Sequence, residues 1–379
     1  MSDISFYSIL TKTGFYNIGI GEIIMICIGF AFIYLAIAKE MEPYELLPIG
    51  FGIIFANLPL TRIMAFTQDV QGSGILGVFF HYGLYIWNLL PPLIFLGIGA
   101  MTDFGPLIAN PRTLLFGAAA QIGIYLAFWG AVLAGFDLSE ACSIGIIGGA
   151  DGPTTIYTTA MLAPHLLGIT AITAYSYMAM VAIIQPPIMR ALTTEAERKI
   201  VMKQLRPVSK IEKIIFPLIG LIVILLFVPL AAPLIGMLML GNLFRESGVV
   251  KRLADASQNE LMNIVTIFLM LCIGATMNAE VFLKLKTLYI LLLGIVAFGT
   301  GTASGILLAK LMNLFSKEKI NPLIGSAGVS AVPMAARVSH ILGQEANPKN
   351  YLLMHALGAN VSGVIGSAVA AGIFLSIMK

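Results

Sequence analysis

Long apolar stretches separated by short polar ones make up most of the chain. They lie near residues 20–38, 46–60, 75–101, 113–136, 141–163, 168–189, 213–244, 261–276, 287–312, 320–336 and 351–378. A helix needs about 20 mostly apolar residues to cross the hydrocarbon core of a bilayer. The pattern therefore predicts an all-α polytopic membrane protein with roughly nine to eleven membrane elements.

Several of these stretches are unsuited to an unbroken crossing. Those at 46–60, 141–163 and 320–336 are short or contain Gly and Pro, and 213–244 is interrupted at Pro229 and Pro233. Because lipid cannot hydrogen-bond to an open backbone, such segments are expected to be half-helices or re-entrant loops packed against protein.

The composition agrees with a lipid-facing surface. Hydrophobic residues make up 58% of the chain, charged residues 11%, and the mean hydropathy is +0.93. Soluble proteins carry about a quarter charged residues, so a disordered chain, a coiled coil and a nucleic-acid-binding protein are excluded. No secretory signal pattern precedes the first stretch, and we expect no cleaved signal peptide. No phosphate-binding loop is present, so we do not expect ATP to drive the protein directly.

A basic stretch divides the chain into two halves. Residues 190–213 hold seven of the 22 basic residues against three Glu. Short loops rich in Lys and Arg stay in the cytoplasm, so this loop is predicted to be cytoplasmic. We therefore expect a first membrane repeat at 1–190, a linker at 191–212 and a second repeat at 213–379.

Three pairs of motifs recur in the same order in both halves, at offsets of 185, 175 and 180 residues. The pairs are Pro48/Asn57 with Pro233/Asn242, Gly97–Asp103 with Cys272–Asn278, and Pro153 with Pro333. Duplicated halves with matching breaks are typical of secondary transporters, whose site lies at the repeat interface. The loop charges support an inverted relationship only in part. Asn57 and Asn242 are either paired ligands or interhelical hydrogen-bonding groups.

Asp151 is the strongest candidate for chemistry. It is the only Asp, Glu, Lys or Arg between Ala141 and Met189, and it lies within Gly-Gly-Ala-Asp-Gly-Pro-Thr-Thr. An Asp at a helix centre costs about 2.5–3.5 kcal/mol to insert, so an intramembrane carboxylate indicates an ion or proton site. Pro153 interrupts the helix and frees carbonyl oxygens that can bind a cation. The alternative is an Asp that caps a half-helix in water.

The matching segment of the second half offers partners for Asp151. Asn321, Ser326 and Ser330 carry oxygen ligands for a hard cation, although small serines also favour helix packing. Arg337 could pair with Asp151, bind an anionic substrate, or be an interfacial charge. Further candidates are Asn360 in the small-residue stretch of the last span and the hydroxyls of Tyr175 and Tyr177, with aromatic packing as the alternative for the tyrosines.

These motifs resemble one family closely. Gly-Gly-Ala-Asp151-Gly-Pro-Thr-Thr, Gly241-Asn-Leu-Phe-Arg-Glu-Ser, Gly325 through Arg337 and Gly358-Ala-Asn360-Val-Ser-Gly resemble the beta subunit of biotin-dependent, sodium-pumping decarboxylases. That family comprises the oxaloacetate, methylmalonyl-CoA and glutaconyl-CoA decarboxylases. The resemblance implies two inverted repeats that form a scaffold and a moving core. It also implies a chain that decarboxylates carboxybiotin, exports Na+ and takes up a proton from outside.

By this resemblance, Asp151 is the Na+/H+ carboxylate, and Tyr177, Asn321, Ser330 and Asn360 are sodium ligands or proton-path groups. Gly325 allows a close approach, and Arg337 meets the carboxybiotin.

The implied partners are a biotin carboxyl carrier subunit, a carboxyltransferase alpha subunit, a small gamma or delta membrane subunit and further copies in a homotrimer of the inner membrane. No Met-Lys-Met biotin acceptor occurs here, so the biotin must come from a partner. The N-terminus looks shorter than in some oxaloacetate enzymes and favours an acyl-CoA-type complex.

A second hypothesis remains from the residues alone. A Na+- or H+-coupled carboxylate transporter without decarboxylase activity would contain the same carboxylate, repeats and broken segments. A non-transporting membrane anchor would not explain a costly Asp in a broken helix.

Overall fold

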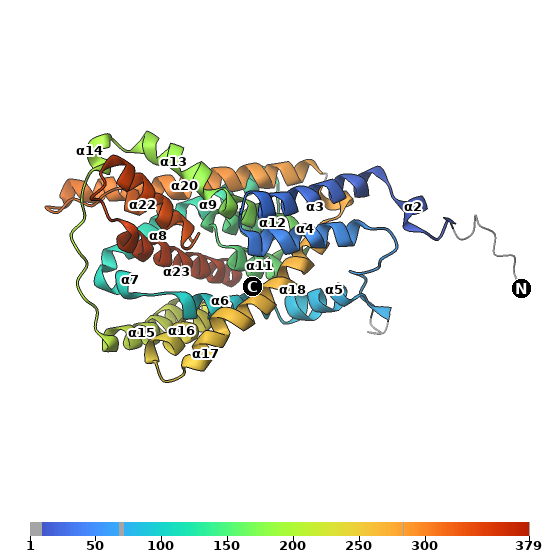
Figure 1. The fold of residues 1–379 in the computed structure, drawn as a ribbon, viewed down its shortest axis with the longest axis horizontal. Helices are drawn as coiled ribbons and strands as arrows, with labels where there is room; N and C mark the ends of the chain where they lie inside the picture. The colour runs from blue at the N-terminus through green and yellow to red at the C-terminus, as the bar shows by residue number, and fades with distance from the viewer. Residues whose placement is uncertain (1–9, 68–71, 283, 379) are drawn as a thin grey trace, which may run out of the picture.

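The structure is a computed structural model that describes residues 10–67, 72–282 and 284–378, and this part of the chain contains helices and no strand. The first half contains α2 (Gly14–Asn17), α3 (Ile20–Ala38), α4 (Pro43–Asn57), α5 (Ile75–Val78), the π-helix η2 (Phe79–Ile86), α6 (Leu90–Met101), α7 (Gly105–Ala109), η3 (Pro111–Thr113), α8 (Leu114–Ala120), α9 (Ile122–Leu133), α10 (Leu138–Gly145), η4 (Ile146–Gly149), α11 (Gly152–Leu162), η5 (Pro164–Leu166), α12 (Leu167–Ala179) and α13 (Val181–Leu192) (Figure 1). After the linker follow α14 (Glu195–Arg198), α15 (Lys210–Phe227), η6 (Pro229–Ala231), α16 (Ala232–Ser247), α17 (Lys251–Ala256), the π-helix η7 (Ser257–Leu261), α18 (Met262–Ala275), α19 (Ala279–Phe282), α20 (Leu285–Phe315), α21 (Leu323–Ser326), α22 (Met334–Ala346) and α23 (Leu353–Met378).

The predicted membrane character is confirmed. In the described ranges, five helices are long and apolar enough to cross a membrane, or up to seven if two bent pairs each count as one span. The helices of these pairs meet at 76° and 64°. The prediction of nine to eleven elements also counted half-helices, such as α16, which the break at Pro229 separates from α15.

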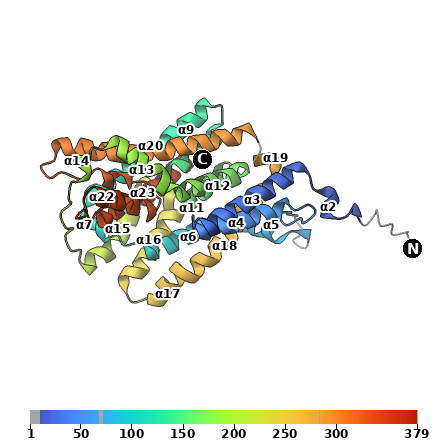
Figure 2. The ribbon, with the colours of Figure 1, turned by 45° about the horizontal axis from the view of Figure 1, so that its top comes forward.

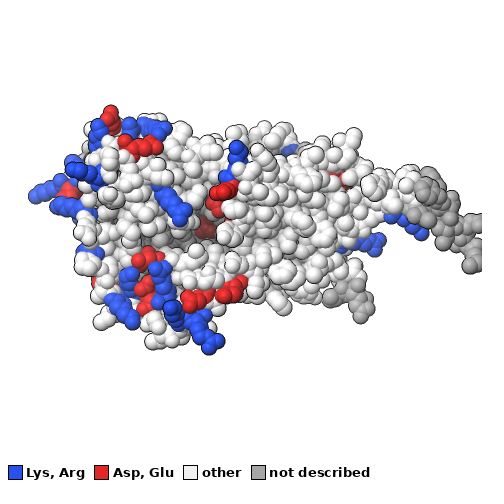
Figure 3. All heavy atoms as spheres, viewed as in Figure 1, with Lys and Arg blue, Asp and Glu red and all other residues white. Residues whose placement is uncertain are grey.

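The outer surface matches this assignment. Large apolar side chains such as Leu133, Phe227 and Phe315 are more than four-fifths exposed, which a lipid environment favours and water does not. Charged side chains gather at the left end of the face drawn in Figure 3, and most of its remainder is uncharged. That face is hollowed near its centre, and acidic side chains border the hollow.

Two helix pairs connect the halves in the same manner. In the first pair, α4 packs on α18, and in the second α16 packs on α6 (Figure 2). In each pair, one Asn side chain donates a hydrogen bond across the interface, from Asn57 to the Met277 carbonyl at 2.6 Å and from Asn242 to the Thr102 carbonyl at 2.7 Å. These asparagines were paired by the sequence repeat, and so were the two acceptor positions. They therefore act as interhelical hydrogen-bond donors.

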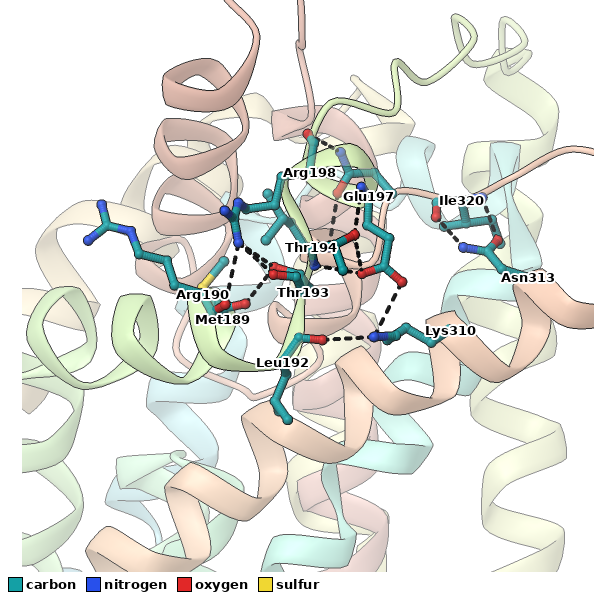
Figure 4. A network of polar contacts seen from close by, with 12 residues as sticks. Met189, Arg190, Leu192, Thr193, Thr194, Glu197, Arg198, Lys310, Asn313 and Ile320 are labelled. Atoms are coloured by element: carbon teal, nitrogen blue, oxygen red, sulfur yellow. Dashed lines mark hydrogen bonds and ion pairs between the residues drawn. The ribbon is translucent and has the colours of Figure 1, made fainter.

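Side-chain contacts hold the start of the basic linker against α20 of the second half (Figure 4). The Lys310 ammonium on α20 donates to the Leu192 carbonyl at 3.1 Å and lies 3.3 Å from the Glu197 carboxylate. The Arg198 guanidinium donates to the Thr193 carbonyl at 2.6 Å. The linker is therefore an ordered part of the fold that ties α13 to α20.

Candidate functional site

Two broken helical segments, one from each half, meet in the interior. The first runs through η4, turns at Ala150 in the left-handed region (φ 54°), and restarts as α11 after Asp151. Pro153 occupies the first turn of α11, where its missing N–H costs nothing. The second break separates α21 from α22, and its Ser330 amide donates to the Gly149 carbonyl at 3.0 Å. This hydrogen bond pairs a backbone N–H of the second break with a backbone carbonyl of the first, two groups that the interrupted helices leave without an intrahelical partner.

Asp151 lies at this meeting point and is 5% exposed. One carboxylate oxygen accepts the Thr154 amide at 3.1 Å, which caps α11, and the other accepts the Ser367 hydroxyl of α23 at 2.6 Å. The Ser330 hydroxyl donates in turn to Ser367 at 3.1 Å. None of the described basic side chains forms an ion pair with Asp151. A buried carboxylate with only neutral partners is stabilised by a bound cation or a proton.

Two further buried oxygen atoms near the breaks accept or donate no hydrogen bond among the described residues. Asn360 on α23 donates through Nδ2 to the Val329 carbonyl at 2.6 Å, and its buried Oδ1 lacks a hydrogen bond among the described groups. The same is true of the buried Thr154 hydroxyl, in the first turn after Asp151. Carboxylate, amide and hydroxyl oxygens are the ligands that hard cations prefer. The donor set therefore fits Na+ as a transported ion.

A cavity of about 350 Å³ opens beside the carboxylate. Its wall includes Asp151, Tyr175 and Ser330, and it extends to Asp103 and Arg245. The side chains of Asp103 and Arg245 are 36% and 38% exposed, so this part of the wall reaches the surface. The cavity therefore connects the molecular surface to the buried Asp151.

The two tyrosines named from the sequence point in different directions. The Tyr177 hydroxyl donates to the Leu291 carbonyl of α20, and its ring lies against Gly294. Tyr175 lines the cavity, and its ring and hydroxyl lie directly beside Gly152. Tyr175 is thus the tyrosine that this structure places next to Asp151.

Some of the remaining predicted residues lie near Asp151 and others do not. Ser330 lies within the Asp151 hydrogen-bond chain, and Asn360 holds the second break through Val329. Asn321 is buried and donates to the Arg198 and Ile200 carbonyls, both at 2.9 Å, so it anchors the linker. Gly325 packs face to face with Gly305 of α20.

Arg337 lies on α22 with an exposed side chain and is not part of the cavity wall. The structure therefore brings Ser330 close to Asp151, with Asn360 bound to the neighbouring backbone. It does not bring Asn321, Gly325, Arg337 or the Tyr177 hydroxyl to the carboxylate.

Three contributors were not singled out from the sequence. Ser367 lay in the small-residue stretch of the last span, Thr154 stood unremarked within the Asp151 motif, and Arg245 appeared only within one of the family motifs. Arg245 could have been noticed in the sequence, because charged residues are rare in this chain. The same holds for Glu42 and Glu45, which also line the cavity. Ser367 gave no such signal, since a serine in a small-residue helix is ordinary.

Comparison with known proteins identifies the family. The family described as the Na+-transporting oxaloacetate decarboxylase beta subunit matches residues 21–378. The chain belongs to this family. It is 60% identical to the methylmalonyl-CoA decarboxylase subunit beta of Propionigenium modestum, with 97% of each chain covered. It is 55% identical to the glutaconyl-CoA decarboxylase subunit beta of Acidaminococcus fermentans, over 98% of this chain and 97% of the relative.

It is also 52% identical to the oxaloacetate decarboxylase beta chain 2 of Salmonella typhi, with 98% of each chain covered. All three kinds of decarboxylase that the motif resemblance indicated are thus represented among its relatives. The resemblance inferred from the motifs is confirmed, and the chain is a member of a Na+-transporting decarboxylase family with membrane helices.

Proposed function

We propose that this beta subunit decarboxylates carboxybiotin and uses the reaction to export Na+ with uptake of a proton. The observation that carries the proposal is the buried Asp151 at the contact of two broken helices, reached by a cavity from the surface. A carboxylate in this position binds Na+ or a proton alternately. Because both forms are neutral, the loaded site avoids carrying a net charge through the low-dielectric interior.

Around this carboxylate, Ser330, Ser367, Asn360 and Thr154 are the proposed oxygen ligands or hydrogen-bonding groups. Tyr175 and Tyr177 are the candidates for the proton path, with Tyr175 favoured by its contact with Gly152. Asn321 and Gly325 act by fixing the second broken segment, through the linker and α20 respectively. Arg337, exposed on α22, is proposed to meet the carboxybiotin as it is delivered.

The energetics require coupling of this kind. Moving one cation against 100 mV costs about 2.3 kcal/mol, so an exergonic reaction must drive export. Decarboxylation supplies that free energy, and membership of a Na+-transporting decarboxylase family supports it. The matching α4–α18 and α16–α6 contacts support two inverted repeats, 1–190 and 213–379, which together form a scaffold and a core that moves around the site.

The proposed working form is a complex in the inner membrane with the 190–213 loop in the cytoplasm. It contains a biotin carboxyl carrier subunit, a carboxyltransferase alpha subunit, a small gamma or delta subunit and three copies of this chain. The two relatives that act on acyl-CoA substrates show 60% and 55% identity against 52% for the oxaloacetate chain, which favours an acyl-CoA-type complex.

The test is decarboxylation of carboxybiotin by the purified complex, with and without Na+, for the unaltered protein and Asp151→Asn. We expect Na+-dependent turnover that Asp151→Asn abolishes and that Asp255→Asn, outside the cavity wall, retains. No turnover by the unaltered complex would refute the proposal and leave a plain carboxylate transporter as the leading alternative. Turnover that persists with full Na+ dependence in Asp151→Asn would remove Asp151 from the coupling site.

A further inference from the structure

Acidic side chains outnumber basic ones in the cavity wall. Four carboxyl side chains line it, those of Glu42, Glu45, Asp103 and Asp151, but Arg245 is the one basic side chain among its described lining residues. Asp103 is paired outside the wall with the Lys213 ammonium at 2.8 Å. An anionic group that enters this cavity therefore finds one cation in its wall.

Arg245 is available for such a contact. It lies in the last turn of α16, where a cation is favoured by the helix dipole. One Nη atom donates to the Met101 carbonyl, and Nε lies 3.4 Å from the Glu246 carboxylate. A guanidinium has five N–H donors in a planar fork, so these contacts leave donors free to bind a carboxylate. The half-exposed position puts them at the mouth of the cavity.

The rest of the wall suits a small ring rather than a free ion. Its apolar side chains include four methionines, Met101, Met178, Met262 and Met270, which adapt to irregular shapes. A volume of about 350 Å³ is within the range that holds a small organic molecule. The apolar part of the wall can hold the rings of a carboxylated heterocycle, and among the charged lining residues only Arg245 can bind its anionic end.

We propose that Arg245 binds the substrate carboxylate at the mouth of this cavity, an inference that rests on the proposed function. The carboxyl group of carboxybiotin is joined to a ureido nitrogen and carries one negative charge. When the C–N bond breaks, neutral CO2 leaves, and the nitrogen takes the proton that the proposed function brings in. The bond electrons remain on that nitrogen, so no oxidant is needed. The products carry no charge for Arg245 to hold, which favours their release.

This assignment differs from the role given to Arg337. Arg337 is exposed on α22 and lies outside the cavity wall, so its contact would precede entry. Arg245 would act at the mouth of the cavity on the carboxylate itself. Its removal should therefore weaken binding of the substrate while leaving Na+ binding at Asp151 unaffected.

The experiment varies free carboxybiotin against the purified complex containing Arg245→Gln, Arg245→Lys or the control Arg252→Gln. Arg252 lies on α17, is exposed and is not part of the cavity wall. Loss of a charge-assisted hydrogen bond raises KM by roughly 10- to 100-fold. We expect this rise in Arg245→Gln with kcat changed less than about threefold, an intermediate KM in Arg245→Lys, and no change in the control.

Half-saturation by Na+ should be the same in all of these proteins, a readout that a general structural defect would disturb. A KM for Arg245→Gln equal to that of the control, or a loss confined to kcat, would overturn the inference while the proposed function stands. Absence of decarboxylation by the unaltered complex would refute the proposed function and this inference together.

Discussion

The close contact between α6 and α16 is sensitive to a single methyl group. At Gly99 an added Cβ would lie 2.0 Å from the Leu238 carbonyl oxygen, and at Gly241 it would lie 2.0 Å from the Leu96 carbonyl oxygen. Ordinary contact begins at 3.4 Å, so the helices must move apart by about 1.4 Å to accept an alanine. Both obstacles are backbone atoms, which cannot rotate away as a side chain does.

We expect Gly241→Ala to destabilise the protein by about 1–3 kcal/mol, the usual cost of overpacking. Separating the helices also lengthens the Asn242 hydrogen bond to Thr102, which is 2.7 Å long. The control is Gly236→Ala on the same helix, where an added Cβ meets nothing within 4 Å. Because Ala favours a helix over Gly, this control should be neutral or stabilising by about 0.5–1 kcal/mol.

The assay is thermal or denaturant unfolding in detergent, followed by tryptophan fluorescence or retention of the folded peak in size-exclusion chromatography. Gly99→Ala and Gly241→Ala act on one contact, so their combined effect should be smaller than the sum of the two. Gly274→Ala, which acts on the separate α4–α18 contact, should add to either. Equal stability of Gly241→Ala and Gly236→Ala would show that the close helix approach is not the controlling feature.

Three further predictions concern the site and its surroundings. The pKa of Asp103 is held below its usual value of 3.8, because hydrogen bonds from a lysine and a backbone amide outweigh the effect of burial. Asp103→Asn should therefore cost about 0.5–1 kcal/mol at neutral pH. In unfolding free energy measured against pH, the difference from wild type should shrink as pH falls below about 4 and disappear only below the lowered pKa of the folded state. Tyr177→Phe should lower the free energy of unfolding by about 1 kcal/mol and retain turnover. Tyr175→Phe should instead lower Na+-dependent turnover. The reverse result in paired activity and unfolding assays would favour Tyr177 as the proton-path group. Ser367→Ala should raise the Na+ concentration for half-maximal activity several-fold, whereas Ser376→Ala on the same helix should not; equal values would exclude Ser367 from the ion site.

Much of the fold followed from local patterns. Apolar stretches predict helices, and prolines predict where they stop, as at Pro229 between α15 and α16. The repeat pairing of Asn57 with Asn242 anticipated two equivalent positions. It left open whether they are ligands or interhelical hydrogen bonds, because that depends on which helix each side chain faces. The structure favours the second reading by placing a carbonyl of the other half within 2.7 Å of each amide.

The site shows the same division. Asp151 is conspicuous in the sequence, because inserting a carboxylate into an apolar segment costs much free energy and packing alone does not explain it. Ser367 is not conspicuous, since a serine in a small-residue stretch is ordinary, although it makes the shortest contact with Asp151. Tyr175 and Tyr177 are two residues apart and chemically identical. A helix turns about 200° over two residues, so they face opposite ways, and only their packing partners distinguish them.

The sequence by itself determined the membrane class, the family, the broken segments and the central carboxylate. Each of these depends on residue type and order along the chain, because hydrophobicity, helix breaks and the cost of a buried charge are local properties. Only the tertiary structure decided which groups surround Asp151, which tyrosine faces it, and that Arg245 shares its cavity. These depend on how α11, α12, α16 and α23 pack, and contacts between residues on different helices are not encoded in any local pattern.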